Sequence, residues 1–212
     1  MLSLEDIIIK AGNFSLKNIS VNIPKGKYAV LMGKSGSGKT TIIESVCGLR
    51  KVKSGKVFID GVDVTNLRPA ERHIGYVPQD GVLFTTMSIR EQLIFGCRLR
   101  GYNKNDSKNR ALEIAEELKI NYLLRRKPSG LSGGEVQRVA LARALASKPK
   151  FICMDEPLSS LDEDSRDEIC ELIKTIHQKE KLTILHVTHS KNEAELMGEM
   201  KLKLSDGQLL GT

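Results

Sequence analysis

The chain has 212 residues, of which 40% are hydrophobic and 28% charged, and its formal net charge is +7 at pH 7. This length allows one domain, or one domain with an inserted lobe, and the sequence holds no bilayer-spanning apolar stretch, no secretory signal pattern and no C-x-x-C pair among its four cysteines. We therefore expect a soluble, cytosolic protein with buried, reduced thiols, and the pattern disfavours a disulfide scaffold or a cysteine-bound metal.

The first sixty residues predict β structure. Ile7–Ile9 is a short apolar run, and residues 14–23 alternate apolar and polar side chains with period two. Residues 57–59 form another apolar run ahead of Asp60-Gly61, which is typical of a hairpin element. We expect an antiparallel β region at this end of the chain.

Residues 28–48 carry the strongest chemical pattern. Residues 28–32 are typical of a buried strand, and residues 41–48 predict a helix. The motif G-x-x-x-x-G-K-[ST] lies between them, formed by Gly33, Lys34, Ser35, Gly36, Ser37, Gly38, Lys39 and Thr40, with Thr41 following. Such a loop turns its backbone N–H groups toward one anion at a helix N-terminus, with Lys39 reaching the outer phosphates and the Thr40 hydroxyl on Mg²⁺. We predict a nucleotide-phosphate site rather than a glycine-rich turn that binds nothing.

From about residue 84 to residue 147 the pattern is helical, and strand patterns return at 151–154 and 183–188 with a helical segment, 165–179, between them. Within the first of these regions, residues 105–119 place four apolar side chains at helical spacing: Ala111, Leu112, Ala115 and Leu118. The alternation of strands and helices predicts an α/β fold with a largely parallel sheet and an all-helical insert in its middle.

Two acids, Asp155 and Glu156, follow the apolar strand at 151–154. A carboxylate at such a strand end can hold the Mg²⁺ that bridges the phosphates, a role we assign to Asp155. Glu156 would orient or deprotonate the attacking water. Alone this pattern is weak, but after a phosphate loop in the same chain it becomes specific.

A second helix start lies at Leu131, Ser132, Gly133, Gly134 and Glu135, ahead of a predicted helix. Ser132 suits an N-cap, and the two glycines leave the first-turn amides uncovered. The residues alone leave two interpretations open: a second phosphate-binding helix N-terminus, or an ordinary capped helix.

The five-residue segment 131–135, followed by Gln137-Arg138, resembles the signature motif of ATP-binding cassette (ABC) ATPases. The other motifs of that family come in the expected order along essentially the whole chain: the phosphate loop, Gln79, the signature, Asp155-Glu156, Ser160-Leu161-Asp162 and His189. Residues 71–80 and 185–189 are similar to the ATPase subunits of prokaryotic importers, of the molybdate, tungstate, sulfate and polyamine types.

The resemblance implies a single ABC ATPase domain over 1–212, with a P-loop NTPase core and an N-terminal antiparallel β subdomain. The nucleotide-binding core would comprise about 1–83 and 148–212, and the helical subdomain about 84–147, including the signature. Many importer ATPases continue into a C-terminal regulatory domain, and we expect none here.

The resemblance also implies roles for individual residues. Gln79 would touch Mg²⁺ or the water and sense a membrane partner, and Mg²⁺ would be held by Thr40, Gln79 and Asp155. His189 would contact the γ-phosphate, and Asp162 would cross between two copies of the chain. ATP would lie between one copy's phosphate loop and the other copy's residues 131–135. Both halves of this composite site are present, so a homodimer, or a dimer with a paralogue, is expected.

Three departures from the family pattern stand out. Glu135 replaces the commoner signature glutamine, and Ser190 stands where importer ATPases often carry aspartate. No tyrosine or tryptophan lies near Lys10, where the family's adenine-stacking aromatic usually falls, and Phe14 is the nearest aromatic side chain. His186 we interpret as a core histidine.

The densest basic runs, 50–56 and 125–127, carry no interleaved aromatic residues, and we interpret them as solvated surface with no nucleic-acid partner. The resemblance implies transmembrane permease subunits as partners, at the cytoplasmic face of a membrane. Three rival functions remain: a soluble ABC-type ATPase acting on nucleic acid or the ribosome, a small-molecule P-loop kinase and a non-catalytic regulator. A nucleic-acid or ribosome ATPase of this type would carry coiled-coil or zinc insertions or a second cassette. A small-molecule kinase would not need residues 131–135, and Glu156 disfavours a non-catalytic regulator.

Overall fold

A computed structural model describes residues 1–12, 14–205 and 207–211, and the chain divides into two units. The core unit comprises Met1–Tyr76, Lys150–Glu156 and Ile173–Thr212, and the helical unit comprises Val77–Pro149 and Pro157–Leu172. The finer division into one cassette domain with a helical subdomain at 84–147 stays a prediction.

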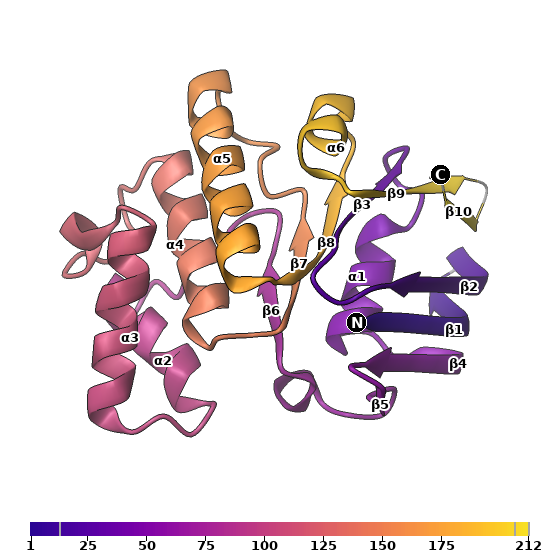
Figure 1. Ribbon diagram of the computed structural model, residues 1–212, viewed down its shortest axis with the longest axis horizontal. Helices are drawn as coiled ribbons and strands as arrows, with labels where there is room; N and C mark the ends of the chain where they lie inside the picture. Colours follow the sequence, from indigo (N-terminus) through magenta and orange to yellow (C-terminus); the bar gives the residue numbers. More distant parts are fainter. Residues whose placement is uncertain (13, 206, 212) are drawn as a thin grey trace. The chain divides into compact units, whose positions relative to one another are not determined.

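The amino-terminal strands of the core unit form an antiparallel sheet in the order β2-β1-β4-β5. These strands are β1 (Leu2–Ala11), β2 (Phe14–Ile23), β4 (Val52–Ile59) and β5 (Val62–Asp63). The bounds of β2 are those of the period-two pattern, and Ile19 and Ile23 enter the core on one face. Leu16 is buried as well, because the register of β2 on β1 shifts between Leu16 and Ile19, where Asn18 has a φ of 54°. Figure 1 shows β1, β2 and β4 side by side.

A second, six-stranded sheet in the core unit has the order β10-β9-β3-β8-β7-β6. Its strands are β3 (Tyr28–Gly33), β6 (Ile74–Val77), β7 (Phe151–Asp155), β8 (Thr183–Thr188), β9 (Met200–Ser205) and β10 (Gln208–Gly211). Strands β9, β3, β8 and β7 pair in parallel, and only β10 on β9 is described as antiparallel. Every residue of β7 and β8 is buried, as is typical of parallel strands covered on both faces. The predicted parallel sheet is thus confirmed.

Helix α1 (Lys39–Cys47) contacts strands of both sheets, and its apolar residues join one hydrophobic core with them. Its C-terminus is fixed by Arg72 at the end of the short 3₁₀ helix η1 (Pro69–Arg72), whose buried guanidinium donates to the backbone oxygens of Ser45 and Val46 at 2.7 and 2.9 Å. A cation on the last carbonyls of a helix satisfies acceptors that have no partner within the helix. The helix that begins at the glycine loop is therefore anchored at its C-terminal end.

The helical unit contains α2 (Ile89–Arg98), α3 (Lys104–Glu117), the 3₁₀ helix η2 (Asn121–Leu123) and α4 (Gly133–Ala146), while α5 (Glu163–Glu180) begins in this unit and ends in the core unit. Helices α2, α3 and α4 pack on one another (Figure 1). On α3 the predicted apolar face is buried at Ala111 and Ala115, but Leu112 is exposed, because it lies about 100° around the helix from Ala111 and about 60° from Ala115.

The burial expected of the cysteines is confirmed. All four cysteines are free and buried. The runs 50–56 and 125–127 consist of exposed residues apart from the half-buried Arg50 and Val52. Within the described part of the chain, no helix is both long and apolar enough to cross a membrane.

Candidate functional site

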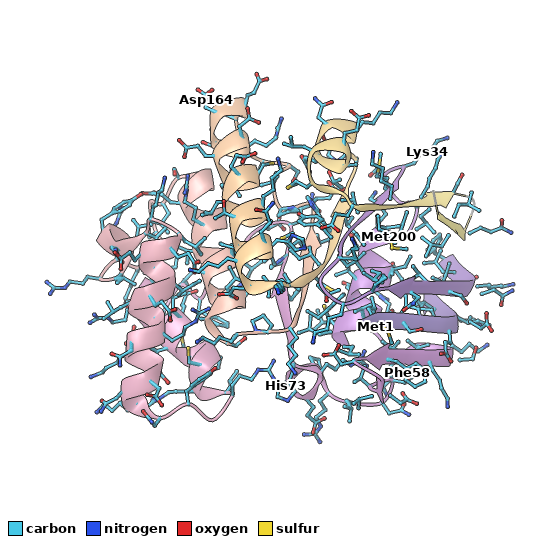
Figure 2. The ribbon with its side chains drawn as sticks, in the orientation of Figure 1. Met1, Lys34, Phe58, His73, Asp164 and Met200 are labelled. Atoms are coloured by element: carbon cyan, nitrogen blue, oxygen red, sulfur yellow. The ribbon has the colours of Figure 1, made fainter. Side chains whose placement is uncertain are left out.

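The loop between β3 and α1 has the backbone that the glycine motif predicts. Gly36 and Gly38 adopt left-handed φ angles of 75° and 104°, which favour glycine, and a Cβ on Gly38 would lie 2.8 Å from the Phe14 ring. No described side chain hydrogen-bonds to cap α1 at Gly38. The first-turn N–H groups of α1 are therefore left to an external acceptor. Lys34 lies on the exposed part of this loop (Figure 2).

Lys39 is held inside the loop. Its side chain is only 5% exposed, and its Nζ donates to the backbone oxygens of Gly33 and Lys34 at 3.0 and 3.1 Å. The same ammonium lies 3.7 Å from Oε1 of Glu156. A buried cation held by its own loop is positioned to receive an anion without reorganisation.

Glu156 and His189 form a hydrogen-bonded pair beside that cation. Nδ1 of His189 lies 3.0 Å from Oε2 of Glu156, although 33 residues separate the two in sequence. Glu156 adopts a left-handed φ of 44°, held there by its N–H, which donates to the Val187 oxygen at 2.9 Å. Such a backbone costs on the order of 1–2 kcal/mol for a non-glycine residue and is typical of functional positions. The side chain of His189 is 63% exposed and that of Glu156 only 17%.

Asp155 ends β7 and is nearly buried, at 3% exposed. Burial raises the pKa of its carboxyl above the ordinary value of 3.8, and the hydrogen bond to the Thr40 hydroxyl opposes that shift. Its Oδ1 is buried and accepts a hydrogen bond from no described residue. A carboxylate oxygen without a partner, next to a threonine hydroxyl, suits a hard cation such as Mg²⁺.

The residues around Asp155 would supply few protein ligands to such a cation. In the described ranges, no three His, Cys, Asp or Glu side chains are grouped as a metal site. Mg²⁺ is commonly held by one or two carboxylates together with substrate phosphates and water, so the donor set fits a cation that arrives with a nucleotide.

The remaining predicted residues belong to the helical unit. Ser132 is the N-cap of α4 and forms a capping box with Glu135: Oγ of Ser132 accepts from Glu135 N at 3.2 Å, and Glu135 Oε2 accepts from Ser132 N at 2.8 Å. Glu135 also accepts a hydrogen bond from the Tyr122 hydroxyl at 3.0 Å. These bonds to Ser132 and Tyr122 hold the pKa of Glu135 below its usual value.

Gln79 lies in an exposed turn after β6. Asp162 accepts a hydrogen bond from Ser165 N at 2.9 Å, which lowers the pKa of its carboxyl. The structure thus brings Lys39, Asp155, Glu156 and His189 together in the core unit, whereas Gln79, 131–135 and Asp162 lie in the helical unit.

Three further residues support the site, and no sequence pattern identified them. Arg72 caps α1, and Thr188 and Glu193 hydrogen-bond each other on either side of His189. Phe14, the nearest aromatic, is 37% exposed and packs against Gly38, so it can contribute to both the core strand and the loop.

The family model described as ABC transporter matches residues 16–159 of this chain. A molybdate/tungstate import ATP-binding protein of Thermococcus kodakarensis is 37% identical over 210 residues, which are 99% of this chain and 64% of that protein. A protein of the same description from Archaeoglobus fulgidus is 39% identical over 202 residues, which are 95% of this chain and 82% of that protein.

Among solved structures, a dimeric ATP-binding cassette in a post-hydrolysis state with ADP and Pi is similar to this chain, with a TM-score of 0.86 and 31% identity over 99% of this chain and 96% of that chain. The fold is that of an ATP-binding cassette, and the predicted P-loop α/β architecture is confirmed. The chain belongs to the ABC transporter family. It spans just under two thirds of the length of the Thermococcus relative.

Proposed function

We propose that this chain is the ATP-hydrolysing subunit of an ABC importer, working on the cytoplasmic face of a membrane. One observation carries the proposal: Lys39, the Glu156–His189 pair and the buried Asp155 converge at the end of an uncapped glycine loop. The relatives described as import ATP-binding proteins support import as the direction. The whole chain would act as one cassette domain.

The nucleotide phosphates would be held by residues 33–41, with Lys39 on the outer phosphates. Mg²⁺, bound by Thr40, Gln79 and Asp155, would neutralise phosphate charge. Glu156 would orient the attacking water and accept its proton, and His189 would contact the γ-phosphate. The side chain of Phe14, beside Gly38, would pack against the base.

A complete site would need two copies of the chain. Residues 131–135 of one copy would close over the ATP held by the phosphate loop of the other, and Asp162 would lie at the contact between them. The dimeric solved cassette supports this arrangement. The partner copy would be identical or a paralogue.

Hydrolysis is tested by two substitutions with opposite expectations. Glu156→Gln should lower turnover by about 10²- to 10⁴-fold with ATP binding retained, because it removes a proton acceptor but no phosphate contact. Lys39→Ala should weaken ATP binding by about 10- to 100-fold, because it removes a charge-assisted hydrogen bond. Steady-state phosphate release and titration with a fluorescent ATP analogue separate the two effects.

The exposed Glu5→Gln on β1 is the control for the hydrolysis test and should match the wild type in both assays. Unchanged turnover in Glu156→Gln would refute the role of that residue. Absence of ATP hydrolysis in the wild type, at any protein concentration, would refute the function.

The permease would dock on the helical unit. Six large hydrophobic side chains of this unit are exposed: Val82, Phe84, Phe95, Leu99, Leu112 and Tyr122. Arg143 lies over the Phe84 ring. A surface hollow of about 520 Å³ lies on the same unit, lined by Arg90, Leu112, Glu116, Asn121, Tyr122, Leu124 and Arg125. Apolar patches rimmed by charge are typical of protein interfaces.

Docking is tested by charge reversal at Arg90, which is exposed. Arg90→Glu should leave basal ATPase activity within about twofold and lose most of the permease that co-purifies with the tagged chain from membranes, since opposed charges steer and align such contacts. Lys17→Glu, an exposed reversal on β2, is the control. Retained permease together with lower hydrolysis would show that the docking surface lies elsewhere.

A further inference from the structure

The residues immediately before and after His189 are both held by side-chain hydrogen bonds. The Thr188 hydroxyl accepts a hydrogen bond from Ser190 N at 3.0 Å and donates one to Glu193 Oε2 at 2.7 Å. Oγ of Ser190 in turn accepts from Glu193 N at 3.3 Å and caps α6 (Lys191–Met197). His189 therefore sits in a turn closed by side chains on both flanks.

The carboxylate at the centre of this turn is buried. Glu193 is 6% exposed, and its Oε2 lies 3.5 Å from Nε2 of His186, a fully buried histidine of β8. Nδ1 of His186 lies 2.9 Å from the hydroxyl of Tyr28 on β3. The Tyr28 hydroxyl also lies 3.5 Å from Sδ of Met197, and Nε2 of His186 faces the Glu193 carboxylate without a hydrogen bond to any described residue. Burying a carboxylate is costly unless it is hydrogen-bonded, as it is here by Thr188.

We propose that Glu193 and Thr188 are positioning residues for His189. This inference rests on the proposed function, because it assigns them to the same hydrolytic site. The imidazole of His189 is largely exposed, so packing alone does not fix its direction. The hydrogen bonds among Glu193, Thr188 and Ser190 fix the backbone at His189 instead. The fixed backbone keeps Nδ1 of the His189 ring in contact with Glu156.

The network explains a buried acid and a buried histidine that the hydrolytic roles do not use. A capped start to α6 requires only Ser190, whose hydroxyl already accepts from Glu193 N. The carboxylate of Glu193 adds a link from α6 back to the end of β8, and that link spans His189. Displacing a reacting group by about 1 Å costs on the order of 10²-fold in rate, so a link of this kind has a measurable effect.

A matched pair of threonines on one strand provides the test. Thr188 and Thr183 stand at opposite ends of β8, both are buried, and the hydroxyl of each accepts one backbone N–H. Thr188→Val should lower the kcat for ATP by about 10- to 100-fold with an unchanged affinity for a fluorescent ATP analogue. Thr183→Val should stay within about twofold of wild type, and Thr188→Ser, which keeps the hydroxyl, should restore most of the rate.

A double-variant comparison separates positioning from loss of stability. If Thr188 acts through His189, then Thr188→Val adds no further loss to His189→Ala, since the group it positions is already gone. Equal effects of Thr188→Val and Thr183→Val, or additive losses in the double variant, would overturn the proposal. Glu193→Gln, which is nearly the same size, gives the same comparison if Thr188→Val does not fold.

A readout without turnover distinguishes this proposal from the proposed function. In nucleotide-free protein, the ¹⁵N NMR shifts of the His189 ring should move in Thr188→Val toward those of Glu156→Ala, because both lose the contact with Glu156. Thr183→Val should leave them in place. A wild type that hydrolyses no ATP refutes the function, whereas His189 shifts unaffected by Thr188→Val refute the positioning role alone.

Discussion

Helices α1 and α4 both begin at glycine-rich segments, and their N-termini differ in capping and in charge. Helix α1 begins after Gly38, where no side chain in the described ranges forms a cap, next to the buried ammonium of Lys39. Helix α4 begins after Ser132 with a complete capping box, in which Glu135 brings a carboxylate to the first turn. The first helix start is cationic and leaves its donors to a ligand, whereas the second satisfies part of its own donors and carries negative charge.

Glycines at a helix start do not by themselves define a phosphate site. The surrounding charge and capping decide whether the first-turn amides face an anion or the protein's own side chains. On the proposed function, the loop at 33–41 binds nucleotide alone, and residues 131–135 join only when a second copy presents the γ-phosphate.

The largest expected effect tests whether the second helix start acts only in a dimer. Without nucleotide, positively charged chains should stay monomeric at moderate concentration. With ATP and Glu156→Gln, hydrolysis cannot release the nucleotide, and a stable dimer should accumulate. Adding Ser132→Arg should abolish the dimer, because its side chain fills the space for phosphate. Light scattering after size exclusion measures the mass directly.

The matched control for the dimer test is Ser54→Arg, an exposed serine on β4, which should leave the dimer intact. A Glu156→Gln protein that stays monomeric with saturating ATP, even at high protein concentration, would contradict the composite site.

A smaller effect is the difference in thermal stability between alanine substitutions at Gly38 and at Gly133. Gly38→Ala should lower Tm by roughly 4–8 °C, because alanine at a φ of 104° is strained by about 1–2 kcal/mol and its Cβ would meet the Phe14 ring. Gly133→Ala should change Tm by less than about 3 °C, because its Cβ would meet Leu161 at an ordinary 3.6 Å and alanine favours the helix. Equal losses of Tm in the two variants, measured by calorimetry, would contradict the expected difference between the two glycines.

The smallest effect uses the opposite pKa shifts of Asp155 and Glu135. Asp155 has a raised pKa in the fold, so its ionised form opposes folding above the ordinary value of 3.8, and Asp155→Asn should raise Tm at neutral pH by about 2–4 °C. Glu135 has a lowered pKa and stabilises the fold above its ordinary value of 4.5, so Glu135→Gln should lower Tm at neutral pH by about 1 °C.

Both differences in Tm should shrink as the pH falls through the range in which these carboxyl groups become protonated. Nucleotide-free protein, followed by calorimetry from neutral to acidic pH, provides the check. A stabilising effect of Glu135→Gln at neutral pH would show that the capping box does not hold the carboxylate.

Local sequence patterns predicted the full length of a strand where the apolar pattern covered the whole strand. The bounds of β2 and β8 match the predicted runs, because each run ends at a turn residue or a polar neighbour. Strand β1 extends well beyond Ile7–Ile9, because pairing with β2 and β4 recruits residues with no strong pattern of their own. Helix α6 was not predicted, because its seven residues carry too little periodicity.

The sequence by itself determined the phosphate loop, because its glycines, lysine and threonine act within one continuous segment. It also placed two acids at the end of β7. Only the tertiary structure paired Glu156 with His189, left Oδ1 of Asp155 without a hydrogen bond from any described residue and linked Glu193 to Thr188. The reason is that parallel β7 and β8 bring their carboxyl ends together from distant parts of the chain, and burial there sets a charge balance that no local pattern encodes.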